Sequence, residues 1–288
     1  TGIRARLTSD QSDLSIDLRS RSTTGEPVVV SDLGTPSGTF PGLGGLVEPG
    51  VLGVVRVSVD PQSVYRLLVS TLPADRRARL KAFWKQLEQK LLIDGPESIL
   101  ENFTGHAVAV FYGLGDDILA GGRGASLRRF FRLQSTREVV VLPITSRTDL
   151  ERLLDKATQV SRGRLSRQQG KHTVQYAWFR DGTLEWALVL SDEHLVFVDS
   201  ATSFDKALQF EHRGGALTAR QRKSMRIGPL LETRDRSGFF LDAATVGNLL
   251  AENGRERAAA WLEPVRSILL TTEMDDEASV TRIDLRLK

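Results

Sequence analysis

A stretch rich in glycine and arginine is the part of the sequence closest in composition to a binding site. In GLGDDILAGGRGASLRRFFR, residues 113–132, glycines would let backbone N–H groups approach an anion. The positive charge there comes from four arginines, Arg123, Arg128, Arg129 and Arg132. The G-x-x-x-x-G-K spacing of a phosphate loop is missing, and the preceding Asp116 and Asp117 would repel phosphate. We favour a loop between strands, with anion binding at the four arginines as the alternative.

The histidines and serines show no catalytic or metal-binding pattern. The four histidines lie in separate segments, and none has a second ligand a few residues away: His106, His172, His194 and His212. No G-x-S-x-G motif occurs, although a serine triad can also assemble in space. Cysteine is absent, which excludes disulfides, thiolate catalysis and sulfur-ligated zinc. The sequence therefore predicts no catalytic residue, no metal site and no cofactor.

Two further charged segments are better explained as solvated surface than as sites. Residues 275–277, Asp-Asp-Glu, lack the alternating ligands and central glycine of an EF-hand, so we interpret them as a turn between the last two strands. Residues 213–228 form the most basic segment, but no run of exposed aromatics or reading helix accompanies it. A solvated helix or linker is favoured there, with contact to anionic lipid or an envelope polymer as the alternative. Nucleic acid is not expected as a partner.

The composition is that of a globular protein. The chain has 288 residues, of which 40% are hydrophobic and 26% charged, and its formal net charge is +3. A chain of this length buries roughly three quarters of its unfolded surface. No apolar run approaches the ~20 residues of a membrane-spanning helix. Because Thr1 starts the sequence and a strand pattern follows at once, we interpret the chain as trimmed or processed.

The N-terminal region alternates with period two. Apolar residues at every second position predict two strands of an antiparallel hairpin with its turn at residues 9–13: Ile3, Ala5, Leu7, Leu14, Ile16 and Leu18. The Gly- and Pro-rich residues 23–50 predict a long connection with at most a short edge strand at Val28–Val30.

Helix and strand signals then follow one another. A strand of alternating valines leads into Asp60 and Pro61, which suit the N-cap and first position of a helix. A second helix is expected from the apolar stripe Leu80, Phe83, Trp84, Leu87 and Leu91. HAVAVFYG, residues 106–113, has no polar face and predicts a strand covered on both sides.

The next segment repeats this order and continues into a meander. Residues 137–160 predict a strand followed by a helix, and residues 173–200 predict three antiparallel strands. The first turn of the meander is expected at Asp181-Gly182, which suits positive φ, and the second near Ser191 to Glu193. A short helix is expected over Ser203 to Phe210.

Two comparisons within the sequence indicate an internal repeat. VDPQSVYRLL (59–68) and LDAATVGNLL (241–250) share an aspartate cap, a hydroxyl residue, a valine and paired leucines, and a helix with a tryptophan follows each. IDLR occurs at residues 16–19 and again at 283–286. Chance similarity between capped helices or amphipathic strands is the alternative explanation.

These patterns predict an α+β fold with mainly antiparallel sheets and helices packed on one face, built from a duplicated strand-helix-helix-strand unit. The expected division is residues 1–50 as a closing hairpin plus connection, 51–212 as a complete unit, and 213–288 as a basic connection and a partial unit. One continuous domain is the alternative to this division.

Two segments also resemble a family of uncharacterised exported or membrane-anchored bacterial proteins known as a domain of unknown function. They are ILENFTGHAVAVFYG (99–113), with its leucine, glycine and alternating alanines, and LSDEHLVFVDSATSFDKAL (190–208). The matches cover about a third of the chain. The resemblance implies an extracytoplasmic location and a duplicated α+β unit, with any anchor outside this chain. It implies no activity, because the family has none established.

We therefore predict a non-catalytic bacterial envelope protein with a binding or scaffold role, whose partner would be an envelope protein, a lipid or an anionic polymer. The first alternative is a carrier of an apolar or anionic ligand between sheet and helices, with the Gly-rich residues 40–50 as a mobile rim. The second alternative is an enzyme with spatially assembled carboxylates.

Overall fold

The computed structural model describes the backbone of residues 2–10, 13–21, 51–91, 93–114, 136–198, 227, 230, 236–274 and 278–288. Several predicted features lie outside these residues. They are the edge strand at Val28–Val30, the helix over Ser203 to Phe210, the turn at residues 275–277 and most of the basic segment 213–228.

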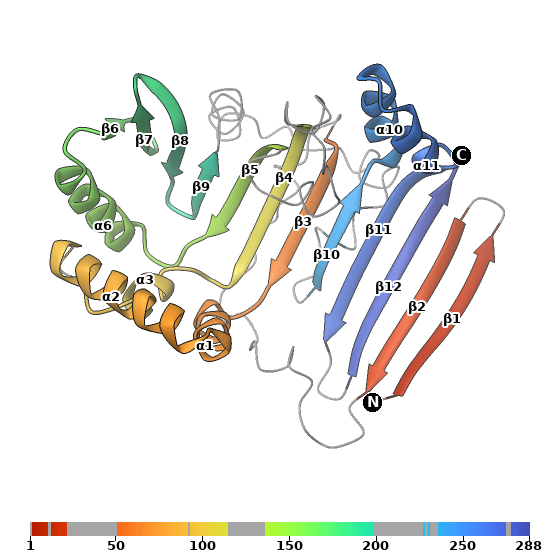
Figure 1. Ribbon diagram of the computed structural model, residues 1–288, viewed down its shortest axis with the longest axis horizontal. Coiled ribbons are helices and arrows are strands. Elements are labelled where there is room, and N and C mark those ends of the chain that lie inside the picture. Colours follow the sequence, from red (N-terminus) through yellow and green to blue (C-terminus); the bar gives the residue numbers. More distant parts are fainter. Residues whose placement is uncertain are drawn as a thin grey trace.

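Within the described residues, twelve strands form one open sheet in which every neighbouring pair is antiparallel (Figure 1). From edge to edge the order is β1 (Gly2–Asp10), β2 (Asp13–Arg21), β12 (Ala278–Leu287), β11 (Val265–Met274), β10 (Arg236–Leu241), β3 (Gly53–Ser58), β4 (His106–Leu114), β5 (Thr136–Pro143), β9 (His194–Val198), β8 (Thr183–Leu190), β7 (Val174–Arg180) and β6 (Leu165–Gln169).

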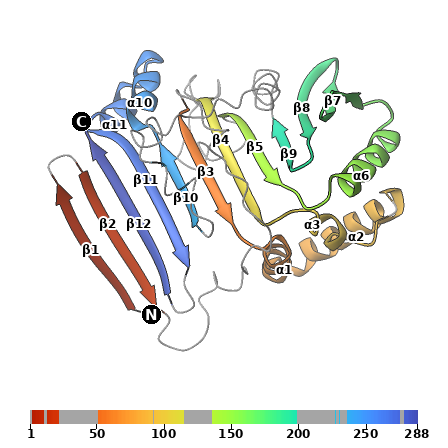
Figure 2. The same cartoon turned by 180° about the vertical axis from the view of Figure 1, so that it is seen from behind.

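Six described helices accompany the sheet: α1 (Pro61–Thr71), α2 (Ala74–Leu91), α3 (Glu97–Leu100), α6 (Arg147–Val160), α10 (Ala243–Glu252) and α11 (Glu256–Leu262). Seen from behind, α1 to α3 lie beyond one end of the central strands, and α10 and α11 lie beyond the other end (Figure 2). The protein is thus an α+β protein with an antiparallel sheet, as the sequence predicts.

Local signals in the sequence locate several elements correctly. β1 and β2 form the predicted hairpin. Asp60 is the N-cap of α1, accepting hydrogen bonds from the N–H groups of Gln62 and Ser63, and Pro61 is the first helical residue. The turn between β7 and β8 contains Asp181 at φ 51° and Gly182 at φ 79°. Each of these features depends on residues that are close in sequence, which is why it could be predicted.

Three expectations are wrong or incomplete. In β4, Val108 and Val110 are fully buried, but Ala107 and Ala109 on the opposite face are only half-buried, so the strand is not covered on both sides. In α2, Phe83 is 52% exposed, and Leu91 is the helix's one buried residue. The edge strand β6 was not predicted, because its sequence, LSRQQ, has one apolar residue followed by four polar ones and so no alternation.

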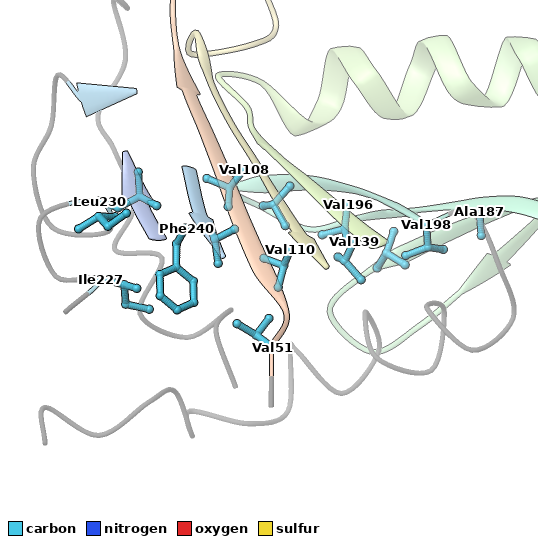
Figure 3. Close-up of a cluster of buried hydrophobic side chains, with 14 residues drawn as sticks. Val51, Val108, Val110, Val139, Ala187, Val196, Val198, Ile227, Leu230 and Phe240 are labelled. Carbon is cyan, nitrogen blue, oxygen red and sulfur yellow. The ribbon is translucent and has the colours of Figure 1, made fainter. Parts of the chain in front are cut away.

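The largest core lies on one face of the sheet. Val108 and Val110 pack there with Val139, and the chain crosses this face at Ile227 and Leu230 (Figure 3). The close-up shows α6 on the opposite side of the sheet. On that opposite face, α6 packs over β7, β8 and β9, and α10 with α11 packs over β10 and β11.

The order strand, helix, helix, strand, strand occurs twice in the chain. One set is β3, α1, α2, β4 and β5, with the short α3 added before β4, and the other is β10, α10, α11, β11 and β12. β3 and β10 are adjacent and antiparallel, and each set extends outward from this pair in the opposite direction. Asp242 is the N-cap of α10, as Asp60 is of α1.

The sheet is closely packed at Gly238 in β10. A Cβ atom at this position would lie 2.3 Å from the Leu270 carbonyl oxygen and 2.8 Å from the Leu230 side chain. Opposite Gly238, the fully buried Arg56 of β3 donates a hydrogen bond of 2.7 Å from Nη1 to the Leu230 carbonyl oxygen. Glycine therefore lets the chain at Leu230 lie directly on the sheet.

Candidate functional site

An apolar groove lies between α1, α3 and the neighbouring ends of β3, β4 and β5. Its cavity volume is about 440 Å³. Its apolar walls include Val57, Val59, Val64, Leu68, Leu100 and Phe103, and the polar residues that line it are Tyr65 and His106. No charged residue lines it. This composition suits a ligand that is itself mostly apolar.

The floor of the groove is formed by small residues of the chain leading into β4. Gly105, at φ 85°, turns into the strand, and Ala107 follows two residues later on the face toward α1. Gly105 has no side chain and that of Ala107 is a single methyl group, and this leaves the space that the groove occupies. The half-buried face of β4, which departs from the sequence prediction, is therefore the floor of the candidate site.

The groove is open because the apolar face of α1 is not buried. None of the residues of α1 is buried, although the helix is amphipathic. Leu68 is 51% exposed, and Val57 on the facing strand is 39% exposed. In a globular protein such a stripe normally packs against the core.

The corresponding helix in the other set of elements, α10, has its apolar face packed into a core. Val246 of α10 occupies the position of Val64 in the aligned sequences and is 2% exposed, whereas Val64 is half-buried. Ala243, aligned with Pro61, is fully buried. Both α10 residues belong to a cluster that includes Leu241 of β10.

One aligned position changes how each helix meets the helix that follows it. Gly247 of α10 lies against α11, since a Cβ atom there would be 3.5 Å from the Leu262 Cβ. In α1 the aligned residue is Tyr65, whose ring meets Trp84 of α2 edge-on, with centroids 6.1 Å apart and planes at 89°. A tyrosine ring at this position separates the two helices, whereas glycine allows them to pack closely.

The structure brings one serine and one histidine together at the groove. The Oγ of Ser58 lies 3.1 Å from the Nδ1 of His106, and the N–H of Ser58 donates to the Oγ of Ser237. The His106 side chain is only 2% exposed, so the contact is better explained as a hydrogen bond joining β3 to β4 than as a catalytic pair.

A second, polar cleft of about 530 Å³ lies between α3 and the N-terminal half of α6. Three acidic residues line it, Asp94, Glu101 and Asp149, together with the basic Arg152 and Lys156. Asp149 already accepts a hydrogen bond of 2.7 Å from Ser146, the N-cap of α6, and lies 3.3 Å from Arg152. Among the described residues, no group of three or more acidic or histidine side chains could hold a metal ion. Catalysis by assembled carboxylates stays a prediction.

A polar network joins α6 to β6 and β7 away from both cavities. The fully buried Tyr176 donates a hydrogen bond of 2.7 Å to Asp155, and Arg167 lies 2.8 Å from the same carboxylate. Burial, together with the hydrogen bond to Asp155, raises the pKa of the Tyr176 hydroxyl above its usual value. The network therefore acts as a structural connection.

The residues singled out in the sequence do not form a site in the described structure. Arg123, Arg128, Arg129, Arg132 and His212 lie outside the described residues, as does the Gly-rich segment 40–50. His172 is exposed in the turn before β7, and His194 begins β9. The groove was missed because its lining comes from five elements. One signal could have indicated it, namely Tyr65 standing where the aligned segment has Gly247.

Comparison of the chain with protein-family models, with curated proteins and with solved structures finds no match. The resemblance to exported bacterial proteins therefore stays a prediction. Among the described helices, none combines the length and hydrophobicity needed to cross a membrane.

Proposed function

We propose that the protein is a non-catalytic binding protein that takes an apolar ligand in the groove between α1, α3 and the sheet. The observation that carries this proposal is the contrast between Val64 and Val246. The two residues hold aligned positions in helices that follow equivalent strands, yet Val246 is packed into a core and Val64 faces an open cavity. The packing of α10 indicates that this order of elements can pack without leaving a groove. The groove at α1 is therefore due to the particular residues of α1 and of the elements around it.

The lining defines the class of ligand. A volume of about 440 Å³ falls within the range of small-molecule sites, roughly 300–1,000 Å³. With no charged residue in the lining, a buried charge on the ligand would have no partner, and this is costly. The site therefore suits a hydrocarbon chain or ring, and each Å² of apolar surface removed from water contributes about 25 cal/mol.

We also infer that the two sets of elements arose by duplication. The aligned segments 59–68 and 241–250 share their capping aspartate, valine and paired leucines, and both lead from a strand into a capped helix. On this view one copy kept a closed core and the other acquired the groove. An extracytoplasmic location remains a proposal that rests on the sequence resemblance alone.

The direct test is binding of a neutral fluorescent hydrocarbon, such as diphenylhexatriene, by the purified chain. Ala107→Leu would add three carbon atoms to the floor of the groove and should weaken binding at least about tenfold. Ala109→Leu is the matched control, because Ala109 is on the same strand and face, is also half-buried and does not line the groove. It should leave the affinity within about twofold. Equal loss in both variants, or no binding by the unaltered chain, would contradict the proposal.

A further inference from the structure

The helix α2 is unusual in being long, basic and mostly exposed. Its 18 residues, ADRRARLKAFWKQLEQKL, contain six basic and two acidic residues, and only Leu91 is buried. It lies at the rim of the molecule beside α1 and α3 (Figure 2). Core packing therefore does not explain the composition of its outer side.

The outer side of α2 carries a basic stripe with an aromatic residue in it. Arg76, Arg79, Phe83 and Lys90 are spaced by three, four and seven residues, which places them along one side of a helix. All four are exposed, and Phe83 exposes 52% of its surface. Of the two acidic residues of α2, Asp75 lies in the first turn next to Arg76, and Glu88 lies on the other side of the helix, toward Tyr65. We refer to these four residues as the α2 stripe.

The cations of the α2 stripe differ from those of α6 in their pairing. On α6, Arg147 lies 2.5 Å from Asp192, and Arg152 lies 3.3 Å from Asp149. On α2, Arg76, Arg79 and Lys90 make no ion pair with any residue that the structure describes. Unpaired cations along one side of a helix leave a positive surface that an anionic partner could neutralise.

The α2 stripe is connected to the groove through aromatic contacts. The ring of Phe83 lies 5.7 Å from that of Trp84, and Trp84 in turn meets Tyr65, which lines the groove. One turn beyond Tyr65, the exposed Leu68 lines the groove as well. Exposed apolar side chains, and cations that form no ion pair with a described residue, therefore occur on the neighbouring helices α1 and α2.

We propose that the α2 stripe is a docking surface for an anionic phospholipid membrane. Basic residues are attracted to acidic headgroups, and an exposed aromatic residue among them inserts at the boundary of the acyl chains. This pattern fits a lipid surface better than a nucleic acid, where several aromatic rings would be needed for stacking. The evidence for docking comes from α2 alone. The docking proposal depends on the proposed function only in one respect, namely that the membrane would supply the apolar ligand.

The test is co-sedimentation of the full chain with phosphatidylcholine vesicles, with and without phosphatidylglycerol. We expect binding only when phosphatidylglycerol is present, and weaker binding as salt is raised. Arg79→Glu with Lys90→Glu should raise Kd at least about tenfold, and Phe83→Ser should raise it at least about threefold. The matched control, Arg164→Glu with Lys171→Glu, reverses two exposed cations around β6 and should change Kd less than about twofold.

Several results would overturn the proposal. They are equal binding to neutral vesicles, absence of binding to anionic vesicles at low salt, equal loss in the control, or tighter binding of duplex DNA lost in the α2 variant. The two proposals fail separately, because the α2 variant should still bind the neutral fluorescent hydrocarbon. Likewise Ala107→Leu should still bind anionic vesicles.

Discussion

Ile16 of β2 lies directly opposite Ile283 of β12, although the two residues belong to opposite ends of the chain. Each is the first residue of an IDLR segment, so the two copies run antiparallel to each other in neighbouring strands. Next to them, Asp17 is paired with Arg282, whose Nε lies 3.8 Å from the carboxylate. The sequence recurrence thus marks the junction at which the N-terminal hairpin joins the C-terminal strand.

This pairing predicts an energetic coupling between the two isoleucines. Ile16→Ala and Ile283→Ala should each lower the free energy of unfolding by about 1 kcal/mol, since both side chains are half-buried. The double variant should lose less than the sum, by about 0.5 kcal/mol, because cross-strand partners interact directly. Urea unfolding of the four proteins measures this coupling. Strict additivity would contradict the pairing.

Gly238→Ala should destabilise the protein by about 2 kcal/mol or more, because the new methyl group would meet the Leu270 carbonyl at 2.3 Å. Gly247→Ala is the control. Its methyl group would have only ordinary contacts, and replacing glycine within a helix should stabilise α10 by about 0.5 kcal/mol. Opposite shifts in the midpoint of urea unfolding are expected. Similar shifts would contradict the packing at β10.

Tyr176→Phe should cost about 1 kcal/mol, because Asp155 loses a partly buried hydrogen bond. The raised pKa of the Tyr176 hydroxyl means that the folded state favours the neutral phenol. Its contribution is therefore fully present below the unfolded value of about 10 and is lost as the pH rises above it. Unfolding measured at pH 8 and pH 11 should show a smaller loss in the variant. An equal loss of unfolding free energy in the two proteins would contradict the role given to the neutral Tyr176 hydroxyl.

His194 predicts a loss of stability in acid. Burial lowers the pKa of His194 below 6.5, and Glu193 only partly opposes this effect. The folded state therefore favours the neutral ring, so its contribution is present above pH 6.5 and declines as the pH falls through the lowered value. His194→Gln should reduce the difference in unfolding free energy between pH 7.5 and pH 5. The same substitution at the exposed His172 should leave the wild-type difference intact.

Features that depend on neighbouring residues could be predicted from the sequence. The caps at Asp60 and Asp242 depend on hydrogen bonds to residues two or three positions ahead, and the turn at Asp181-Gly182 depends on positive φ. The alternation around Ile16 was enough to predict a strand of a hairpin, because successive side chains of a strand point to opposite faces of the sheet. The α+β class follows from the sum of such local signals.

The tertiary structure alone decided the strand order, the cover on each face of the sheet and the groove. Ala107 and Val108 have similar chemistry in the sequence, yet one lines a cavity and the other is fully buried, because distant segments cover only one face of β4. The exposure of Phe83 could not be predicted from the apolar stripe of α2 either. Helical periodicity shows which residues share a face, but not whether another element packs against that face. Whether a side chain is buried depends on the segment that packs against it. The local sequence pattern of one segment does not show which distant segment that is.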